Sequence, residues 1–216
     1  MMNYKYPVLL LFSLLTGIQV IAQKPFTEGI IVYKVTMMTA DNKEYKGVYT
    51  FTFKGTQIKK ELKLGNGYQD VVIYNCGAST LYSLQNRGGK KYAIQLSMEH
   101  YIQEQEKFAG FHLKTETTDN KKIAGFTANK GAISYNDGTV AEISYTNEWY
   151  PSQPIAFERF PDARFFPLYF SYTDEKGMTM QFEATKIEAE PIENSVFRIP
   201  PDYKIISYGE YKELSK

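Results

Sequence analysis

The residues best suited to metal or acid–base chemistry are two histidines, His100 and His112. A zinc site normally needs several His or Cys ligands at short spacing, as in H-E-x-x-H on one helical face, and neither histidine lies in such a pattern. The chain also lacks the G-x-S-x-G, G-x-G-x-x-G and G-K-[ST] motifs of serine hydrolases, dinucleotide-binding proteins and P-loop proteins. We therefore predict no catalytic residue, no metal site and no cofactor, and we expect that the protein is not an enzyme.

Carboxylates and one thiol are the other reactive groups. Pairs such as Glu104 with Glu106 and Asp174 with Glu175 could supply acid–base chemistry, but charged residues on strands and turns usually face solvent. Cys76 lies in the apolar run VVIYNCG, where packing as a small hydrophobic residue is favoured. A single cysteine cannot form an internal disulfide, so we expect the core to supply the stability.

Aromatic residues make up 15% of the chain, which is more than a small flat sheet needs on one face. They either fill a packed core or line a cavity for an apolar ligand. Residues 150–167 (YPSQPIAFERFPDARFFP) hold four prolines and several phenylalanines, and large apolar side chains on a loop must pack against something. We expect this segment to be a lid over the mouth of a curved sheet. The predicted ligand-binding residues are Trp149, Phe157, Phe160, Phe165, Phe166 and Tyr169.

The elements that must position these side chains are mostly strands. Apolar and polar residues alternate along the chain, and Tyr, Phe, Val, Ile and Thr dominate. Turn residues separate the runs at 65–67, at 119–120 and at 136–138, where Asn-Asp-Gly is the strongest hairpin signal. The predicted strands are residues 28–39, 44–55, 57–64, 68–76, 80–85, 91–96, 111–118, 122–128, 131–135, 139–145, 168–173, 178–187 and 193–199.

One segment has helical spacing instead. Ser97 can cap a helix that runs to about Phe108, and Gly110 can end it. The prolines of residues 150–167 exclude that segment as an interior strand. The sequence therefore predicts a mainly β fold: a single strongly curved antiparallel sheet, or half-barrel, with one or two helices and a proline-rich lid loop.

The amino end predicts export. Lys5 precedes the largely apolar run 8–22, which is too short for a comfortable membrane span and ends in small residues. We expect residues 1–22 to be a signal peptide cleaved after Ala22, and residues 23–216 to form a single domain; an uncleaved anchor is the alternative. The 25 basic and 24 acidic side chains nearly balance, which argues against a nucleic-acid surface.

Several short motifs resemble a known family. They are KKIAGFTA at residues 121–128, ISYTNEW at 143–149, GIIVYKV at 29–35 and FRIPPDYK at 197–204. Together they resemble the GLPGLI family and its exported relatives in Gram-negative bacteria, although FPLYF at 166–170 stands where the GLPGLI motif itself would lie. The resemblance implies a LolA/LolB-like fold, whose best understood members carry lipoprotein acyl chains across the periplasm.

The sequence thus leaves two functions open. The first is a periplasmic, non-catalytic protein that holds a lipid, an acyl chain or another apolar ligand in the concave face of a half-barrel, with a role in lipoprotein or envelope traffic. The alternative is a structural or interaction module of the cell envelope whose concavity is filled by its own side chains. We expect a monomer whose partner is the apolar ligand or an envelope protein, with neither a nucleic-acid partner nor a membrane span after cleavage.

Overall fold

A computed structural model describes residues 23–214, and the side chains of all of these except residues 117–120. The predicted signal peptide, residues 1–22, lies outside the described part of the chain. Within the described part, fourteen strands form two sheets. The strands are β1 (Lys24–Phe26), β2 (Glu28–Met38), β3 (Glu44–Lys54), β4 (Gln57–Leu64), β5 (Gln69–Asn75), β6 (Thr80–Arg87), β7 (Lys90–Leu96), β8 (His112–Ile123), β9 (Phe126–Ser134), β10 (Val140–Thr146), β11 (Trp149–Pro151), β12 (Phe166–Thr173), β13 (Thr179–Glu188) and β14 (Lys204–Ser207).

Twelve strands form one large sheet, in the order β14-β7-β6-β5-β4-β3-β2-β13-β12-β10-β9-β8. All neighbours are antiparallel except β14 and β7, which are parallel. The sheet does not close, since its edge strands β14 and β8 are not paired with each other. A separate parallel pair, β1 with β11, lies beside it. The predicted mainly β fold with one large open sheet is confirmed.

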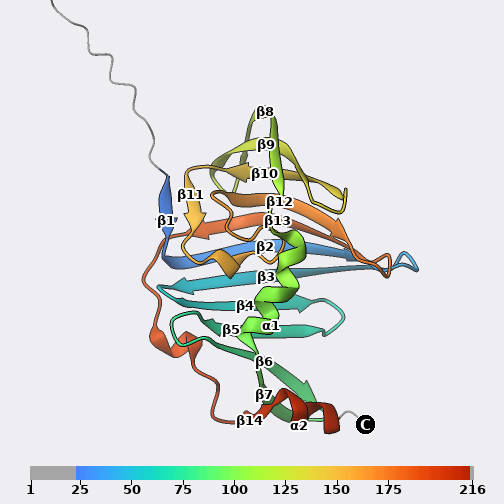
Figure 1. The fold of residues 1–216 in the computed structure, drawn as a ribbon, viewed down its shortest axis with the longest axis vertical. Coiled ribbons are helices and arrows are strands. Elements are labelled where there is room, and N and C mark those ends of the chain that lie inside the picture. The colour runs from blue at the N-terminus through green and yellow to red at the C-terminus, as the bar shows by residue number, and fades with distance from the viewer. Residues whose placement is uncertain (1–22, 215–216) are drawn as a thin grey trace, which may run out of the picture.

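The chain builds this sheet in two halves that meet at β2. Strands β2 to β7 form a meander, and the chain then crosses back in front of the central strands as helix α1 (Met98–Gln105) and the 3₁₀ helix η1 (Glu106–Phe108) (Figure 1). Strands β8 to β10 form the far edge, and β12 and β13 fill the space between β10 and β2. Segments that are distant in sequence therefore face each other across one inner surface.

The inner face, which α1 covers, carries the main core. The register places Phe182, Val35, Gly47 and Leu64 in one row across β13, β2, β3 and β4. Buried side chains from both halves join in a single cluster on this face. Period-two alternation keeps these residues on one side of each strand, so the aromatic excess seen in the sequence is concentrated here.

The outer face carries a second, smaller core. Residues 189–203, which include the 3₁₀ helix η3 (Asn194–Phe197), pack Ile192 and Phe197 against Val71 and Leu84. Glu28 holds this segment by accepting a hydrogen bond from the backbone N–H of Ile192 at 2.8 Å. The chain end then adds β14 and helix α2 (Tyr208–Glu213) to the edge of the sheet.

Close approach of the chain fixes a glycine at the start of β2. Gly29 has φ +142°, a region that side chains disfavour, and a Cβ built there would lie 2.2 Å from the carbonyl oxygen of Glu188. Only glycine therefore lets β13 and β2 approach at this point.

The predicted helix and its cap are confirmed. Ser97 accepts a hydrogen bond from the backbone N–H of His100, and the helical segment ends at Phe108. Other predictions are wrong in detail. The chain turns at Ala124 and Gly125, both with positive φ, and not at residues 119–120, because β8 continues through an irregularity to Ile123. Residues 194–197 are a 3₁₀ helix and not a strand, and the sequence predicted neither β14 nor α2.

Within the described residues, none of the helices combines the length and the apolar character that crossing a membrane requires.

Candidate functional site

The proline-rich segment packs into the inner face. Residues 152–165, called the plug here, link β11 to β12 and contain the 3₁₀ helix η2 (Pro154–Ala156). Phe157 and Phe160 are 3% and 2% exposed, and their rings lie 5.1 Å from Phe51 and 5.2 Å from Phe170 respectively. The plug ends two residues earlier than the sequence suggested, because Phe166 already pairs with Thr146 as the first residue of β12.

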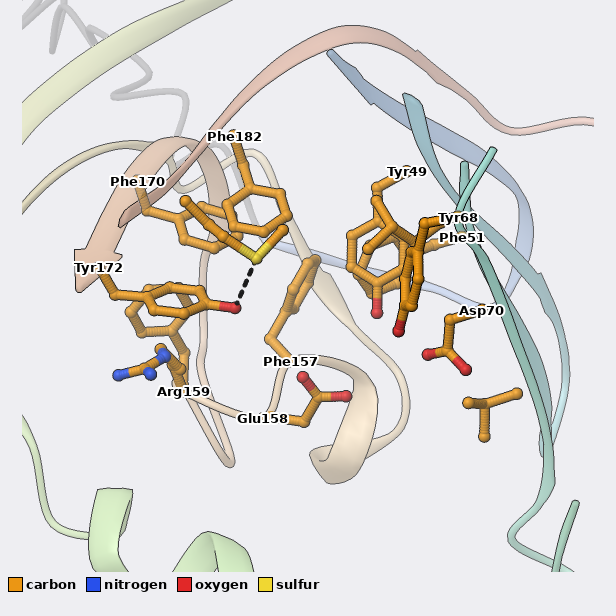
Figure 2. A pocket seen from close by; sticks show the side chains of 14 residues that line it. Tyr49, Phe51, Tyr68, Asp70, Phe157, Glu158, Arg159, Phe170, Tyr172 and Phe182 are labelled. Carbon is orange, nitrogen blue, oxygen red and sulfur yellow. Dashed lines mark hydrogen bonds between the residues drawn. The ribbon is translucent and has the colours of Figure 1, made fainter. Parts of the chain in front are cut away.

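A cleft of about 260 Å³ remains between the plug and the sheet. Phe157 projects between two groups of rings, one from β12 and β13 and the other from β3 and the turn between β4 and β5 (Figure 2). The lining is mostly aromatic or aliphatic, with polar groups at its ends. The lining residues are Tyr49, Phe51, Leu62, Tyr68, Asp70, Val72, Phe157, Glu158, Arg159, Phe160, Phe170, Tyr172, Met180 and Phe182.

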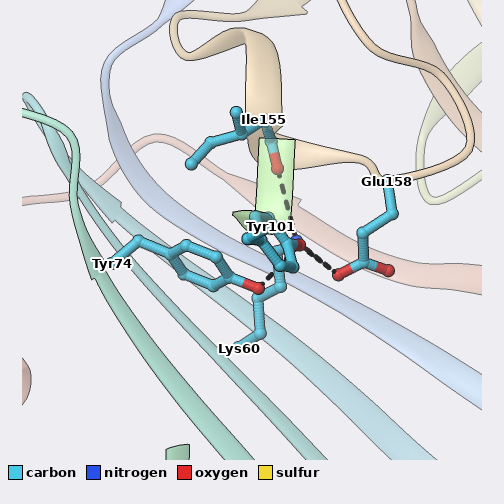
Figure 3. Close-up of polar contacts among 5 residues, drawn as sticks. All are labelled: Lys60, Tyr74, Tyr101, Ile155 and Glu158. Atoms are coloured by element: carbon cyan, nitrogen blue, oxygen red, sulfur yellow. Dashed lines mark hydrogen bonds and ion pairs between the residues drawn. The ribbon is translucent and has the colours of Figure 1, made fainter. Parts of the chain in front are cut away.

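A buried polar network fastens the plug beside this cleft (Figure 3). Lys60 on β4 is 1% exposed, and its ammonium lies 2.9 Å from the Glu158 carboxylate and 3.4 Å from the carbonyl oxygen of Ile155. Tyr101 on α1 donates to Glu158 at 2.7 Å and accepts from the Tyr74 hydroxyl at 2.8 Å. These contacts, called the latch here, join β4, β5, α1 and the plug.

Charge and burial shift the pKa of the Glu158 carboxyl in opposite directions. Burial alone would raise the pKa of its carboxyl, but the Lys60 ammonium and the Tyr101 hydroxyl outweigh that effect and hold the pKa below its usual value. The Lys60 ammonium also lies 4.7 Å from the centre of the Tyr74 ring, which favours a cation. The latch is therefore an ion pair at neutral pH.

A second carboxyl lies at the same end of the cleft. Burial raises the pKa of Asp70, and the negative charge of Glu158 raises it further. Gln85 donates a long hydrogen bond of 3.4 Å to Asp70. In Figure 2, Asp70 and Glu158 face each other below the hydroxyls of Tyr49 and Tyr68. This end of the cleft is polar and acidic.

Arg159 places a positive charge at the opposite end of the cleft. The guanidinium of Arg159 lies 3.6 Å from the centre of the Tyr172 ring and 4.7 Å from that of Phe108. Its backbone carbonyl accepts a hydrogen bond from the Tyr135 hydroxyl at 3.0 Å, which fixes this part of the plug. Arg159 also lines a neighbouring hollow of about 460 Å³ that lies under the β9–β10 and β12–β13 turns.

The structure brings together two of the six predicted ligand-binding residues, Phe157 and Phe160, which line the cleft. Phe165 and Phe166 are buried in the core beside it. Trp149 packs against Phe26, with ring centres 5.2 Å apart, at the β1–β11 pair.

Tyr169 lies elsewhere. It lines a different hollow, together with Lys130, Ser144 and Glu183 from the adjacent strands. It therefore does not contribute to the cleft beside the plug.

The sequence reasoning missed Lys60, and a signal for it existed. The inward positions of β4 are Ile58, Lys60, Leu62 and Leu64, so a charged residue interrupts an otherwise apolar face. A lysine at such a position needs a buried partner. The partner Glu158 is 98 positions away in sequence, and no local pattern identifies it.

The candidates for metal or nucleophilic chemistry lie apart from the cleft. His100 is exposed and pairs with Glu104 along helix α1, at 3.3 Å. Burial raises the pKa of the half-buried Cys76 thiol, so little thiolate forms near neutral pH. No three His, Cys, Asp or Glu residues are grouped as metal ligands in the described part of the chain.

No protein-family model matches the chain, and neither does any curated protein. The resemblance to the GLPGLI family therefore rests on short motifs. Among solved structures, the chain is similar to a LolA superfamily protein from Nitrosomonas europaea, with a TM-score of 0.43 and 10% identity, over 82% of this chain and 92% of that one. It is also similar to a de novo designed fluorescence-activating β-barrel, with a TM-score of 0.22 and 10% identity, over 75% and 94% of the two chains.

Proposed function

We propose that the protein is a non-catalytic carrier that holds an apolar molecule in the cleft between the plug and the sheet. The observation that supports this most strongly is the cleft itself, an aromatic-lined space of about 260 Å³ between the plug and the inner face of the sheet. Ligand sites are typically concave and mostly apolar, with a few polar groups that orient the ligand. Asp70, Glu158 and Arg159 occupy such orienting positions at the two ends.

The cleft volume limits the ligand. Small-molecule sites typically span about 300–1,000 Å³, so about 260 Å³ accommodates a compact apolar group or the end of an acyl chain. Each methylene buried contributes about 0.8 kcal/mol, or about 6 kcal/mol for eight of them. Association costs a comparable amount, so we expect weak binding unless the cleft widens.

Helix α1 lines none of the cleft itself, but it holds Glu158, which does, so its displacement would release that end of the plug. Its fully buried residues are Met98 and Gln105, and the Tyr101 ring packs 5.2 Å from the Tyr74 ring. The Gln105 Nε2 is buried without a hydrogen-bond partner among the described residues. The hydroxyl of Tyr101 is the polar contact that ties the helix to the plug, through Glu158. A helix that packs so little apolar surface is held weakly, so displacing it costs less than displacing the phenylalanines of the plug.

The finer proposal concerns location and cargo. The charged, apolar and small residues of positions 1–22 support export, and the motif resemblance to the GLPGLI family supports a periplasmic protein with a LolA-type role in carrying acyl chains. The open twelve-stranded sheet, covered on its inner face by a helix and a loop, is compatible with that role.

A second function is favoured by a different observation. Phe157, Phe160 and Phe165 of the plug are each at most 4% exposed, so the plug fills most of the concavity with the protein's own side chains. A filled concavity favours an interaction module of the cell envelope that binds a protein partner through its edges or loops.

A cleft-filling variant separates the two functions. Val72 lines the cleft, and Val72→Phe adds a ring to that space; Val48, which is 44% exposed on β3, gives the matched control Val48→Phe. The assay is the fluorescence enhancement of the neutral apolar dye N-phenyl-1-naphthylamine. The carrier proposal predicts saturable binding by the wild type and Val48→Phe, and loss of binding in Val72→Phe. Absence of binding in all three proteins would favour the interaction module.

A further inference from the structure

We propose that the ligand of the cleft carries an anionic group, a carboxylate or a phosphate, which the guanidinium of Arg159 binds. This inference rests on the carrier function proposed above and specifies the chemical class of its ligand. Arg159 lies on the boundary between the aromatic cleft and the more open hollow beside it.

Arg159 forms no ion pair among the described side chains, and Glu158 attracts its charge only over a longer distance. Its guanidinium lies against the faces of Tyr172 and Phe108, and no carboxylate among the described side chains forms an ion pair with it. The acidic neighbour Glu158 is paired with Lys60 instead. Arginines in partly buried sites are normally matched by an acidic partner, and the described side chains supply none within ion-pair distance here.

Stacking also determines which donors remain available. A guanidinium that lies on ring faces presents its N–H groups along its edge, in a planar fork that matches two oxygens of a carboxylate or a phosphate. The contact with Tyr172 holds that fork at the border of the apolar cleft. A molecule with its apolar part against Phe157 and Phe182 could therefore place an anionic group on Arg159.

Two of the three carboxylates that line the neighbouring hollow stabilise their own turns. Asp174 accepts hydrogen bonds from the backbone N–H groups of Lys176 and Met178, and Asp137 accepts one from that of Thr139. Glu175 and Lys176 also line the hollow and carry opposite charges, and among the described side chains no ion pair joins Glu175 to Arg159.

The other end of the cleft sets the orientation. Asp70 and Glu158 lie across Phe157 from Arg159 (Figure 2), so an anion placed there would be repelled. The two ends thus differ in charge along one apolar channel. The ligand is expected to direct its anionic group to Arg159 and its apolar end toward the rings between Arg159 and the two carboxylates.

The test compares four probes that each have an eight-carbon chain and differ in the polar group: octanoate, octyl phosphate, octanol and octylamine. Displacement of the bound naphthylamine dye gives the affinity of each. We expect wild type to bind octanoate or octyl phosphate about tenfold or more tightly than octanol, and octylamine most weakly. The ratio between the two anions distinguishes a carboxylate from a phosphate ligand.

Variants assign the preference to one side chain. Arg159→Gln should lower the affinity for the anions to that for octanol, while Arg159→Lys should keep part of the preference. Arg164→Gln is the matched control, because Arg164 also stacks on a tyrosine, Tyr150 at 4.8 Å, but does not line the cleft. If Arg159→Gln fails to fold, the Arg159→Lys and wild-type data still measure the preference.

The outcomes separate this inference from the proposed function. Equal binding of all four probes, or an anion preference that survives in Arg159→Gln, would overturn the inference and leave the carrier function standing. Tightest binding of octylamine, reduced in Asp70→Asn, would also overturn the inference and reverse the polarity of the ligand. Failure of every probe and of the dye to bind would refute the carrier function itself.

Discussion

Replacing Glu158 by glutamine is expected to destabilise the protein more than replacing its partner, Lys60, by methionine. The Lys60 side chain is 2% exposed and the Glu158 side chain is 43% exposed. Glu158→Gln leaves a buried ammonium without its counter-ion, whereas Lys60→Met leaves a carboxylate that still reaches water and accepts a hydrogen bond from Tyr101. The difference in burial between the two side chains therefore predicts a larger loss of stability for Glu158→Gln than for Lys60→Met.

The expected magnitudes follow from the contacts that remain. Removing one partner of a buried pair costs about 3–5 kcal/mol. Lys60 keeps the carbonyl of Ile155 and the rings of Phe51 and Tyr74, so we expect about 3 kcal/mol for Glu158→Gln, or about 6–12 °C in Tm. For Lys60→Met, an apolar replacement of similar length, we expect less than about 1.5 kcal/mol.

Urea unfolding followed by the fluorescence of Trp149, the single tryptophan, measures both variants. The double variant Lys60→Met/Glu158→Gln serves as the control and should be close to Lys60→Met alone, because it contains no stranded charge. Equal losses in the two single variants, or a larger loss in Lys60→Met, would refute the reasoning about burial.

The same carboxyl predicts a dependence on pH. The pKa of Glu158 is lowered in the folded protein, so its ionised form stabilises the fold above the unfolded pKa. That contribution is lost as the pH falls through the lowered folded pKa. Wild type should therefore lose more stability on acidification below about pH 4.5 than Glu158→Gln does.

Three further predictions concern the plug, the sheet and the thiol. Phe157→Ala should cost about 3–5 kcal/mol in urea unfolding, because it leaves a cavity under the plug. Gly29→Ala should lower the free energy of unfolding by more than about 2 kcal/mol, because the added Cβ would meet a carbonyl oxygen. Gly138→Ala, with open space around it, should cost about 1 kcal/mol. Equal losses in the two variants would contradict the steric clash at Gly29. Cys76 should react with a disulfide reagent more slowly in the folded than in the urea-unfolded protein at about pH 8, and equal rates would exclude a burial effect on its pKa.

The fold was predictable because its strands carry a regular signal. Alternation gave β2, β3 and β4 nearly to their ends, and the cap at Ser97 located the helix. The errors lie where local rules compete. Ala124 takes a positive φ that alanine normally disfavours, so in the turn after β8 only Gly125 gives a sequence signal. Strand β14 is short and forms by parallel pairing with β7 at the sheet edge, which no local pattern predicts.

The site was predictable only in part. Large apolar residues on a proline-rich loop required burial, and Phe157 and Phe160 are indeed buried along the cleft. Glu158 and Arg159 lie between them in sequence, but their roles depend on Lys60 and Tyr172, which belong to distant strands. Contacts over such separations follow from the three-dimensional path of the chain and have no local pattern.

Native mass spectrometry of the protein purified from its own cells, followed by organic extraction, tests the carrier function most directly. The account predicts an added mass that extraction identifies as an apolar molecule with an anionic group. Val72→Phe, which fills the cleft, should lack that mass, and Val48→Phe should retain it. A bare mass for the wild type, together with no binding of octanoate, octyl phosphate or octanol, would contradict the account.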